Sequence, residues 1–350
     1  MKRMKFEDIL EIKNGRNQRA VENPTGKYPI YGSGGIMGHA DDYICDAHTV
    51  IIGRKGNINN PIFVEEPFWN VDTAFGLSAN TDVLLPRFLY YFCKKFDFER
   101  LNKTVTIPSL TKSDLLKIEI ELPNLLQQQD IVERLTKIEK IIALRKQELS
   151  KLEDLVRARF IEMFGVYPTN PLGWEEGTIR DIVADVRYGS SRAAVDGGKY
   201  PYLRMNNITY GGELDLSDIK HIDVPDNELE KCTVRRGDVL FNRTNSKELV
   251  GKTCVYDRDE MMVLAGFVIR VRVTDRILPE FLSAFLNTEF SKQMLFSMCK
   301  TAIGQANINA QELQNIRIYI PPIDLQQQFT QFKKQTAKSK FTKSFRLLRY

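Results

Sequence analysis

The chain has 350 residues, 43% of them hydrophobic and 27% charged, and a formal net charge of +5 at pH 7. This length and composition are typical of two globular domains of ordinary size. The absence of any run of about 18 apolar residues excludes a membrane span. The N-terminus MKRMKFEDIL also lacks the apolar core of a signal peptide. We expect a cytoplasmic protein without membrane contact, whose mild basic excess permits nucleic-acid binding without proving it.

The first 122 residues are predicted to form a β-rich domain. Short apolar runs are broken by turn residues, as in residues 28–39, and residues 49–57 are typical of a strand that leads into a loop. A helix is predicted from Pro86 to Glu99. Together these features favour a mixed, irregular domain in which loops follow short strands.

The spacing of the cysteines bears on metal binding. The five cysteines are scattered and form no CxxC pair, so in a reducing compartment we expect buried thiols. Cys45 lies near His39 and His48, which admits a zinc site as an alternative interpretation. A structural zinc site needs a fourth ligand, and none is close in the sequence. We therefore predict no metal site.

A long helix is predicted next, within residues 123–165. From Asp130 onward, apolar residues follow two seven-residue series between charged positions, and no Pro or Gly interrupts them before Gly165. About 35 helical residues give a rod of roughly 50 Å. The pattern favours one strand of a coiled coil over a lone amphipathic surface helix, since an exposed seam needs a partner. The predicted seam residues are Ile131, Leu135, Ile138, Ile142, Leu149, Leu152 and Val156.

The second half of the chain repeats the first in the same order. The most specific matches are Leu85–Leu89 with Leu278–Leu282, Ile118–Pro123 with Ile316–Pro321, and Gln127–Gln129 with Gln326–Gln328. Offsets of 193 to 199 residues are too long for a solenoid and indicate two copies of a whole domain. The second copy is predicted to span 166–320, with a helix from Pro279 to Cys299.

A second, shorter helix is predicted at 321–350. Its apolar face would hold Phe329, Phe332, Ala337, Phe341 and Phe345. Equivalent modules related by a pseudo-twofold axis point in opposite directions, so we expect this helix to pack antiparallel to the first. The predicted fold is α+β, with two similar mixed, β-rich domains (1–122 and 166–320) separated by two long antiparallel coiled-coil helices.

The chain resembles the specificity subunit of Type I restriction–modification systems along essentially its whole length. The resemblance lies in residues 106–115, which lead into Leu122-Pro123 and Gln127–Gln129, and in the return of that segment before the second helix. Residues 28–35 and 52–56 also look like target-recognition domains of that family. No single motif is diagnostic, and the ordered repetition makes the match specific.

The resemblance implies that the chain is not an enzyme. Each domain would read one half of a split site on double-stranded DNA, and the helices would set the spacing between the halves. Two methyltransferase subunits and the restriction or translocase subunits would dock on it. S-adenosylmethionine and ATP would be bound by those partners, so no cofactor is expected here. The early end of the second helix departs from the family and puts one docking surface in doubt.

Loop residues that can donate to bases or phosphates are the candidate DNA contacts. Arg and Lys suit guanine, and Asn can bind adenine in a bidentate manner. The alternative interpretation is that these are ordinary surface-loop residues, for which Asn and Lys are common. The candidates are Tyr31, Ser33, Arg54, Lys55, Asn57, Asn59 and Lys103 in the first copy, and Arg204, Asn206, Asn207, Arg243, Asn245, Lys247 and Gln305 in the second.

Motifs of catalysis are incomplete. The triplet Gly251-Lys252-Thr253 lacks the earlier glycine of a phosphate-binding loop, since Ser246 occupies that position. Pro321-Pro322 is not preceded by Asn or Asp, as the amino-methyltransferase tetrad would require. Two functions remain: a DNA-specificity module, and a protein–protein scaffold with two binding heads on a rigid coiled-coil rod.

Overall fold

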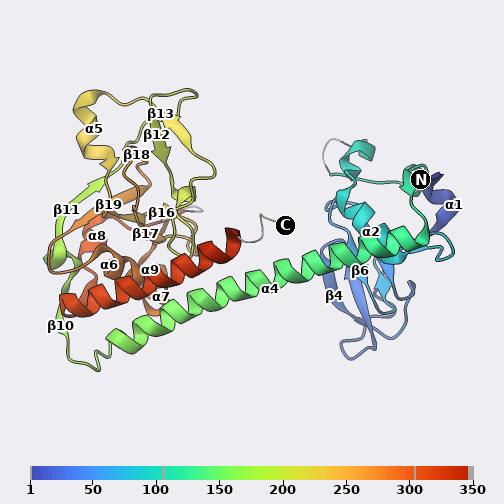
Figure 1. Ribbon diagram of the computed structural model, residues 1–350, viewed down its shortest axis with the longest axis horizontal. Helices are drawn as coiled ribbons and strands as arrows, with labels where there is room; N and C mark the ends of the chain where they lie inside the picture. Colours follow the sequence, from blue (N-terminus) through green and yellow to red (C-terminus); the bar gives the residue numbers. More distant parts are fainter. Residues whose placement is uncertain (1, 105–106, 303–304, 346–350) are drawn as a thin grey trace. The chain divides into compact units, whose positions relative to one another are not determined.

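The chain folds into two compact units, Met1–Arg145 and Lys146–Tyr350, according to a computed structural model that describes residues 2–104, 107–302 and 305–345. Each unit combines small sheets with short helices, so the predicted α+β class with two β-rich domains is confirmed (Figure 1). The long helix α4 (Leu125–Phe164) is continuous and begins in the first unit, as the sequence predicts.

The first unit is built on three sheets. Its four-stranded sheet has the order β2 (Leu10–Asn14), β8 (Ala74–Ala79), β5 (Thr49–Gly53), β6 (Ile62–Val64). Its three-stranded sheet has the order β4 (Gly35–Ala40), β3 (Tyr28–Gly32), β7 (Trp69–Asn70). The third pairs β1 (Lys2–Lys5) with β9 (Glu119–Leu122). The helices are α1 (Phe6–Ile9), α2 (Pro86–Lys95), the 3-10 helix η1 (Phe98–Leu101) and α3 (Lys112–Leu116).

The second unit has more elements in the same arrangement. Its sheets are β11 (Val183–Tyr188), β19 (Val268–Val273), β15 (Val239–Asn242), β17 (Thr253–Val255); β13 (Lys220–Ile222), β12 (Tyr200–Leu203), β18 (Met262–Leu264), β14 (Thr233–Val234); β16 (Thr244–Asn245), β21 (Gln305–Asn307), β20 (Lys300–Ala302); and β10 (Glu175–Thr178), β22 (Arg317–Ile320). Its helices are η2 (Ile179–Ile182), η3 (Met205–Asn207), α5 (Asp226–Cys232), α6 (Pro279–Leu286), α7 (Glu289–Met298), α8 (Ala310–Gln314) and α9 (Ile323–Phe345).

The two units share one topology, which explains the sequence repeat. The order β2-β8-β5-β6 returns as β11-β19-β15-β17, and β4-β3-β7 returns within β13-β12-β18-β14. The closing pair β1-β9 returns as β10-β22. Leu122 ends β9 and Ile320 ends β22, so the proposed domain boundaries at these residues coincide with strand ends.

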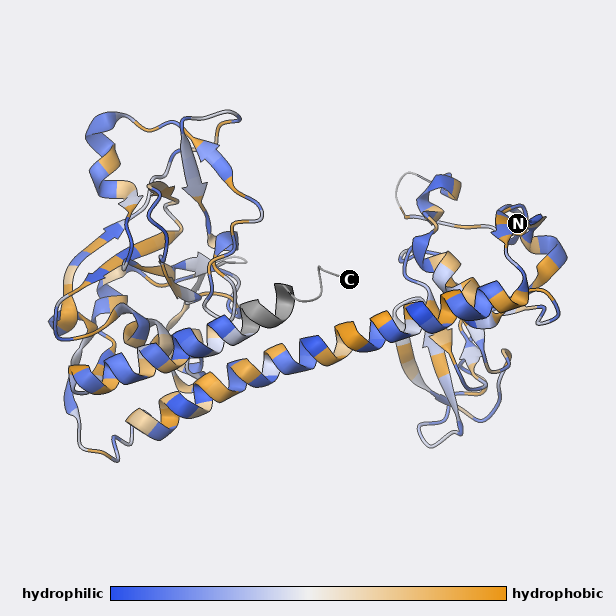
Figure 2. Cartoon of the chain, viewed as in Figure 1, coloured by the Kyte–Doolittle hydropathy of each residue, from blue (hydrophilic) through white to orange (hydrophobic). Residues whose placement is uncertain are grey.

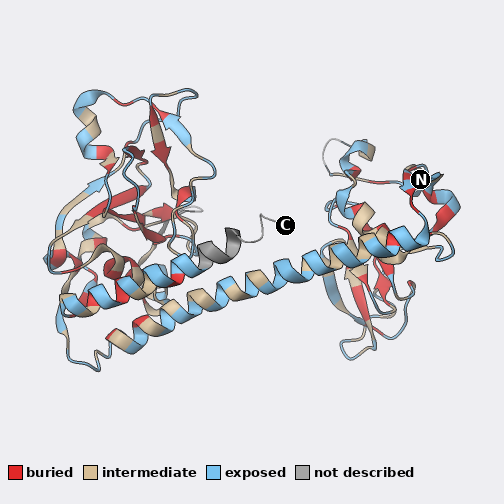
Figure 3. Cartoon of the chain, in the orientation of Figure 1, coloured by how far each residue is buried: buried red, intermediate tan, exposed pale blue. Residues whose placement is uncertain are grey.

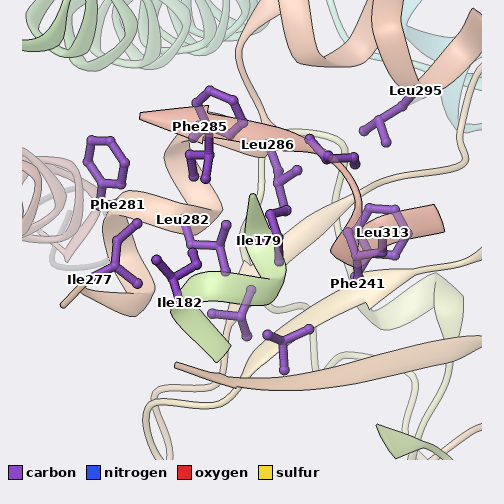
Figure 4. Close-up of a cluster of buried hydrophobic side chains, with 14 of the residues drawn as sticks. Ile179, Ile182, Phe241, Ile277, Phe281, Leu282, Phe285, Leu286, Leu295 and Leu313 are labelled. Atoms are coloured by element: carbon purple, nitrogen blue, oxygen red, sulfur yellow. The ribbon is translucent and has the colours of Figure 1, made fainter. Parts of the chain in front are cut away.

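The central strand of each main sheet is buried on both faces. In β5, Val50 and Ile52 pack into a cluster with Leu89 of α2, while Ile51 faces a separate cluster around Phe68. Successive strand residues point to opposite faces, so a continuous apolar run is what a doubly covered strand requires. The corresponding core of the second unit gathers side chains from η2, β15, α6 and α8 (Figure 4).

The helices after these sheets differ from the prediction. The stretch predicted as helical from Pro279 to Cys299 is two helices, because the Thr288 hydroxyl accepts the Ser291 N–H and starts α7 anew. The Asn287 amide caps the end of α6 by donating to the Ser283 carbonyl. The stretch from Pro86 likewise ends early, at Lys95, and the 3-10 helix η1 follows it.

One buried glutamine fixes the start of each long helix. Gln128 accepts the Leu85 N–H at 2.9 Å and donates to the carbonyls of Val83 and Pro123. Gln326 accepts the Leu278 N–H at 2.7 Å and donates to Arg276 and Pro321 in the same way. These bonds satisfy main-chain groups that would otherwise be orphaned. They give a physical reason for the repeated Gln-Gln-Gln segment.

In the second unit, α9 runs antiparallel to the end of α4. The Phe160 and Phe329 ring centroids are 5.3 Å apart, and the Arg159 guanidinium lies 5.9 Å from the Phe332 ring, so later residues of α9 meet earlier residues of α4. Arg159 also pairs with Glu162, as expected of a cation at the seam. The predicted antiparallel packing is confirmed for this part of the helices. The side chains of Phe341 and Phe345 lie outside the described part of the chain.

The predicted seam is correct in period but not at every position. Near its end α4 buries Phe160 and Phe164, which fall outside both seven-residue series, because these turns pack on Phe281 of the domain core as well as on α9. Earlier in the helix Ile138 and Ile142 are each 50% exposed. Alternating apolar and charged turns, mostly exposed or half-buried, are visible along α4 in Figures 2 and 3. The other seam residues, Ile131, Leu135, Leu152 and Val156, are half-buried, and Leu149 is exposed.

Candidate nucleic-acid interface

Loops that follow the sheet strands meet at one end of the first unit. Main-chain hydrogen bonds join them: Gly15 N–H to Ala74 O, Arg54 N–H to Thr73 O, and Leu110 N–H to Arg54 O. The Val71 N–H donates to Tyr31 O, which brings in the β3–β4 hairpin. We call this surface the reading loops of the first unit, made of residues 15–17, 32–37, 53–57, 71–74 and 107–110.

The second unit repeats this network bond for bond. The Gly189 N–H donates to Val268 O at 3.3 Å, and the equivalent bond of the first unit, from the Gly15 N–H to Ala74 O, measures 3.2 Å. The Arg243 N–H donates to Phe267 O and the Ile308 N–H to Arg243 O, matching the bonds around Arg54. We call this surface the reading loops of the second unit, made of residues 189–191, 203–204, 242–245, 265–268 and 306–308.

A glycine is required at the first loop of each unit. A Cβ on Gly15 would lie 1.8 Å from the Val71 carbonyl oxygen, and one on Gly189 would lie 2.1 Å from the Leu264 carbonyl oxygen. Main chain contacts main chain at this point, so no side chain can be accommodated. The same constraint in both units shows that their reading loops are built on one backbone plan.

Arg54 and Arg243 occupy the same place in the two units. The Arg54 Nη1 lies 3.5 Å from Asp72 O, and the Arg243 Nη1 lies 3.5 Å from Gly266 O, the equivalent carbonyl. Each guanidinium also lies over an aromatic ring, that of Phe75 at 5.8 Å or Tyr188 at 4.8 Å. These contacts place both guanidinium groups at the domain surface, where Arg54 is exposed and Arg243 is half-buried.

Other predicted residues of the first unit are distributed over the reading loops. Lys55 and Asn57 are exposed beside Arg54, and Ser33 lies at the hairpin turn. Tyr31 is half-buried and packs edge-on against Phe68 at 5.4 Å, and burial raises the pKa of its hydroxyl. Tyr31 therefore supports the hairpin, Ser33 is half-buried, and Lys55 and Asn57 face solvent.

Two candidates of the first unit have other roles. The Asn59 side chain accepts the Phe98 N–H at 2.7 Å and donates to Asp97, so its amide ties the loop to η1. The Lys103 Nζ lies 2.8 Å from Asp114, and this hydrogen bond holds the pKa of that carboxyl below its usual range. Both side chains have partners within the protein but lie at the surface, and their assignment as DNA contacts stays a prediction.

In the second unit, Arg204 and Asn207 belong to an internal turn. Asn207 is 2% exposed, donates to the carbonyls of Asp215 and Asp218, and accepts the Arg204 N–H. The Arg204 guanidinium lies 2.7 Å from the Asp218 carboxylate. The assignment of Asn207 to a base edge is wrong, because its amide is buried and fully used, and Arg204 is already paired. Asn206, between them, is exposed.

The remaining candidate DNA contacts of the second unit do not all lie on one surface. Asn245 is half-buried in β16, where its side chain accepts the Ser246 N–H. The Lys247 Nζ lies 4.2 Å from the Phe296 ring of α7, away from the Arg243 contacts. Gln305 begins β21, and its side chain lies outside the described part of the chain. Arg243 and Asn245 thus share a surface, whereas Lys247 faces a different neighbour.

Comparison with known proteins agrees with this duplicated plan. The family model described as "Type I restriction modification DNA specificity domain" matches residues 1–154 and again 171–342. The chain belongs to this family. The two matched segments coincide with the two copies of the fold, so the chain carries the family domain twice.

Curated relatives of this specificity protein are distant and longer. The "Putative type I restriction enzyme MjaX specificity subunit" of Methanocaldococcus jannaschii is 26% identical over 162 residues, which are 45% of this chain and 38% of that protein. The "Type I restriction enzyme EcoKI specificity subunit" of Escherichia coli is 25% identical over 235 residues, 66% of this chain and 49% of that protein. The chain spans less than half the length of these two relatives.

A solved structure shares the fold. The S subunit of a Type-I restriction-modification system from M. genitalium superposes with a TM-score of 0.56 at 17% identity, over 97% of this chain and 92% of that chain. At that identity the likeness concerns the fold alone. It covers both domains and the helices of the specificity protein.

The structure adds residues that the sequence analysis missed. Arg16 and Asn17 are exposed in the loop that Gly15 anchors, and Asp72 is exposed beside Arg54. The recurrence of a glycine at the end of the first sheet strand, Gly15 and Gly189, is the signal that would have located the first loop. Asp72 had no sequence signal, because its place depends on pairing between distant strands.

Neither a metal site nor a membrane helix is found in the described part of the specificity protein. No group of three or more His, Cys, Asp or Glu side chains is placed to hold a metal among residues 2–104, 107–302 and 305–345. Cys45 is buried, and burial raises the pKa of its thiol to about 12. No described helix is long and apolar enough to cross a membrane.

Proposed function

We propose that this chain is the non-enzymatic subunit that gives a Type I restriction–modification complex its specificity for one DNA sequence. One unit would read each half of a split site on double-stranded DNA. The observation that carries the proposal is the duplicated arginine site, in which Arg54 and Arg243 make the same carbonyl contact in loops of the same backbone plan. A repeated surface suits a duplex, which offers similar surfaces at repeated intervals.

The chemistry of the arginine site suits guanine. A guanidinium has five N–H donors, and a bidentate pair to guanine O6 and N7 is the commonest specific contact in the major groove. The carbonyl contact uses one nitrogen of each arginine and fixes its direction. The Arg243 Nε is buried and has no hydrogen-bond partner among the described residues, so the terminal nitrogens of this guanidinium are the ones that would reach a base. Affinity would come from neighbouring cations on phosphates, and Lys55 and Arg16 are exposed for that purpose.

The partners would supply catalysis. Methyltransferase subunits, two of them in our proposal, would bring S-adenosylmethionine, and restriction or translocase subunits would bring ATP. The half-exposed Ile138 and Ile142 on α4 offer an apolar surface for the methyltransferase. Such residues on a charged helix are costly to leave in water, which favours their burial on assembly.

The proposal predicts sequence-specific binding with a steep salt dependence. A complex of this chain with its methyltransferase should bind one duplex sequence far better than others, and log affinity should fall linearly with log salt because phosphate contacts release counterions. Titration at several salt concentrations, with the target identified by methylome sequencing of cells with and without the chain, would measure this. Equal binding to all sequences, or salt-insensitive binding, would contradict the proposal.

A second prediction concerns the arginine site itself. Arg54→Ala should weaken discrimination at one base pair of one half-site by about 1–3 kcal/mol, and Arg243→Ala should do the same in the other half-site. Competition binding with every base pair replaced in turn would locate the two positions. Arg87→Ala is the matched control, because Arg87 also lies over an aromatic ring, that of Phe63, but outside the reading loops. A loss spread evenly over all sequences would mean that the arginines bind phosphate.

A further inference from the structure

The β3–β4 hairpin of the first unit exposes two large apolar side chains. Ile36 is 61% exposed and Met37 is 63% exposed, at the start of β4. Beyond the pairing of Tyr31 with Ile36, strand β3 has no second neighbour, since its contact with β7 ends at Tyr31. The end of the hairpin is therefore a narrow two-stranded ribbon, and Met37 is the extra residue of a β-bulge in it, since Ile30 pairs with Gly38 and Tyr31 with Ile36.

This ribbon adjoins the Arg54 site. The Met37 sulfur lies 2.7 Å from the position a Cβ on Gly32 would occupy, and a methyl of Val71 lies 3.5 Å from the same point. On the other side, the Ser33 Cβ lies 3.1 Å from the Cβ position of Gly53, the residue before Arg54. Ile36, Met37 and Arg54 thus belong to one continuous surface, that of the first unit's reading loops.

The shape and chemistry of the ribbon fit one feature of the duplex. The major groove of B-form DNA admits a two-stranded β-ribbon, and the thymine methyl group is the apolar group that the base pairs present there. Apolar side chains beside a fixed arginine match that mixture of methyl groups and guanine acceptors. We propose that Ile36 and Met37 contact thymine methyl groups in the half-site read by the first unit. This inference rests on the proposed DNA-reading function.

The second unit does not repeat the apolar ribbon. Its strands β12 and β13 are joined by the long connection between Leu203 and Lys220, which folds on itself through Asn207. The exposed large aromatic side chain on that connection is Tyr210, whose ring lies 5.5 Å from the Lys292 Nζ. The thymine contact therefore belongs to one half-site, while the arginine contact is common to both.

Replacing thymine by uracil tests the inference directly, because uracil lacks only the methyl group. With the assembled complex, one such replacement in the first half-site should weaken binding about fourfold, the value of one buried methylene-sized group. The double variant Ile36→Ala, Met37→Ala should bind the thymine duplex more weakly and lose its preference for thymine over uracil. Met261→Ala, at an exposed methionine of the second unit, should behave as the wild type.

The outcomes are distinguishable. Specific binding that is indifferent to uracil at every thymine of that half-site would overturn the inference and leave the proposed function standing. A first half-site that contains no A·T pair would also overturn the inference and leave the proposed function standing. A double variant that no longer assembles with the methyltransferase would assign the ribbon to a protein contact instead. Absence of sequence-specific binding by the wild type would overturn both proposals.

Discussion

The double variant Ile138→Asp, Ile142→Asp should abolish assembly with the methyltransferase while leaving the chain folded. Both side chains are half-exposed on α4, so two carboxylates there cost the isolated chain little. In an assembled complex the same carboxylates would be taken out of water without a partner, at several kcal/mol each. We expect affinity for the methyltransferase to fall by about a thousandfold or more, since each 1.4 kcal/mol is a factor of ten.

Size-exclusion chromatography and calorimetric titration would measure the loss. Lys137→Asp is the matched control, because Lys137 is an exposed residue of the same helix outside the apolar seam. The melting temperature of the double variant should stay close to that of the wild type. Normal assembly by the double variant would show that this surface of α4 is not the docking site.

Asp185→Ala should lower the free energy of unfolding of the second unit by about 3 kcal/mol, at the lower end of the cost of breaking a buried ion pair. The Arg270 side chain is 3% exposed, and its Nη2 lies 2.7 Å from the Asp185 carboxylate. Without that carboxylate the buried guanidinium keeps only its hydrogen bonds to the Thr233 and Glu230 carbonyls. Asp185 is itself 26% exposed, so water can replace part of the loss.

Urea denaturation of the wild type and the variant would measure this difference. Arg187→Ala is the control, because Arg187 bonds the same carboxylate from an exposed position, where such pairs contribute less than about 1 kcal/mol. A loss for Asp185→Ala no larger than that of the control would contradict the importance of the buried pair.

The same ion pair makes stability depend on acid pH. Burial alone raises the pKa of Asp185, but hydrogen bonds from Arg270 and Arg187 outweigh it and hold that pKa below its ordinary value. A carboxyl with a lowered pKa in the folded state stabilises the protein fully above its unfolded pKa. That contribution should disappear as pH falls through the folded pKa, and it should be missing at every pH in Asp185→Ala.

Long periodic elements and the repeat could be predicted from the sequence because their signals are local or ordered along the chain. Residues 130–163 keep an apolar seven-residue period without a helix breaker, and the structure has one helix there. The paired segments that begin at Leu85 and Leu278 occupy equivalent places, at the starts of α2 and α6. The order of such matches was enough to predict two domains of one kind.

Residues whose role depends on tertiary neighbours could not be predicted. Asn207 and Arg204 had the side chains of DNA contacts, yet Asp215 and Asp218, farther along the connection, bond them internally. Phe160 falls outside the seven-residue series because its partner is the domain core as well as a helix. The exposure of Met37 has no signal in the sequence, since exposure at the end of a ribbon is set by strand pairing.

The glycine at the base of the first reading loop in each unit affects which substitutions the loops can accept. Gly15 and Gly189 seat their loops by main-chain contacts, supported by the Trp69 indole, which donates to Arg16 O, and the Tyr202 hydroxyl, which donates to Ser190 O. The exposed side chains of the loops are therefore not needed to hold them in place. Mutations at those side chains can therefore accumulate, or a loop can be grafted from one copy onto the other, without dismantling the domain beneath. If the proposed function holds, new target preferences can arise at small cost in folding.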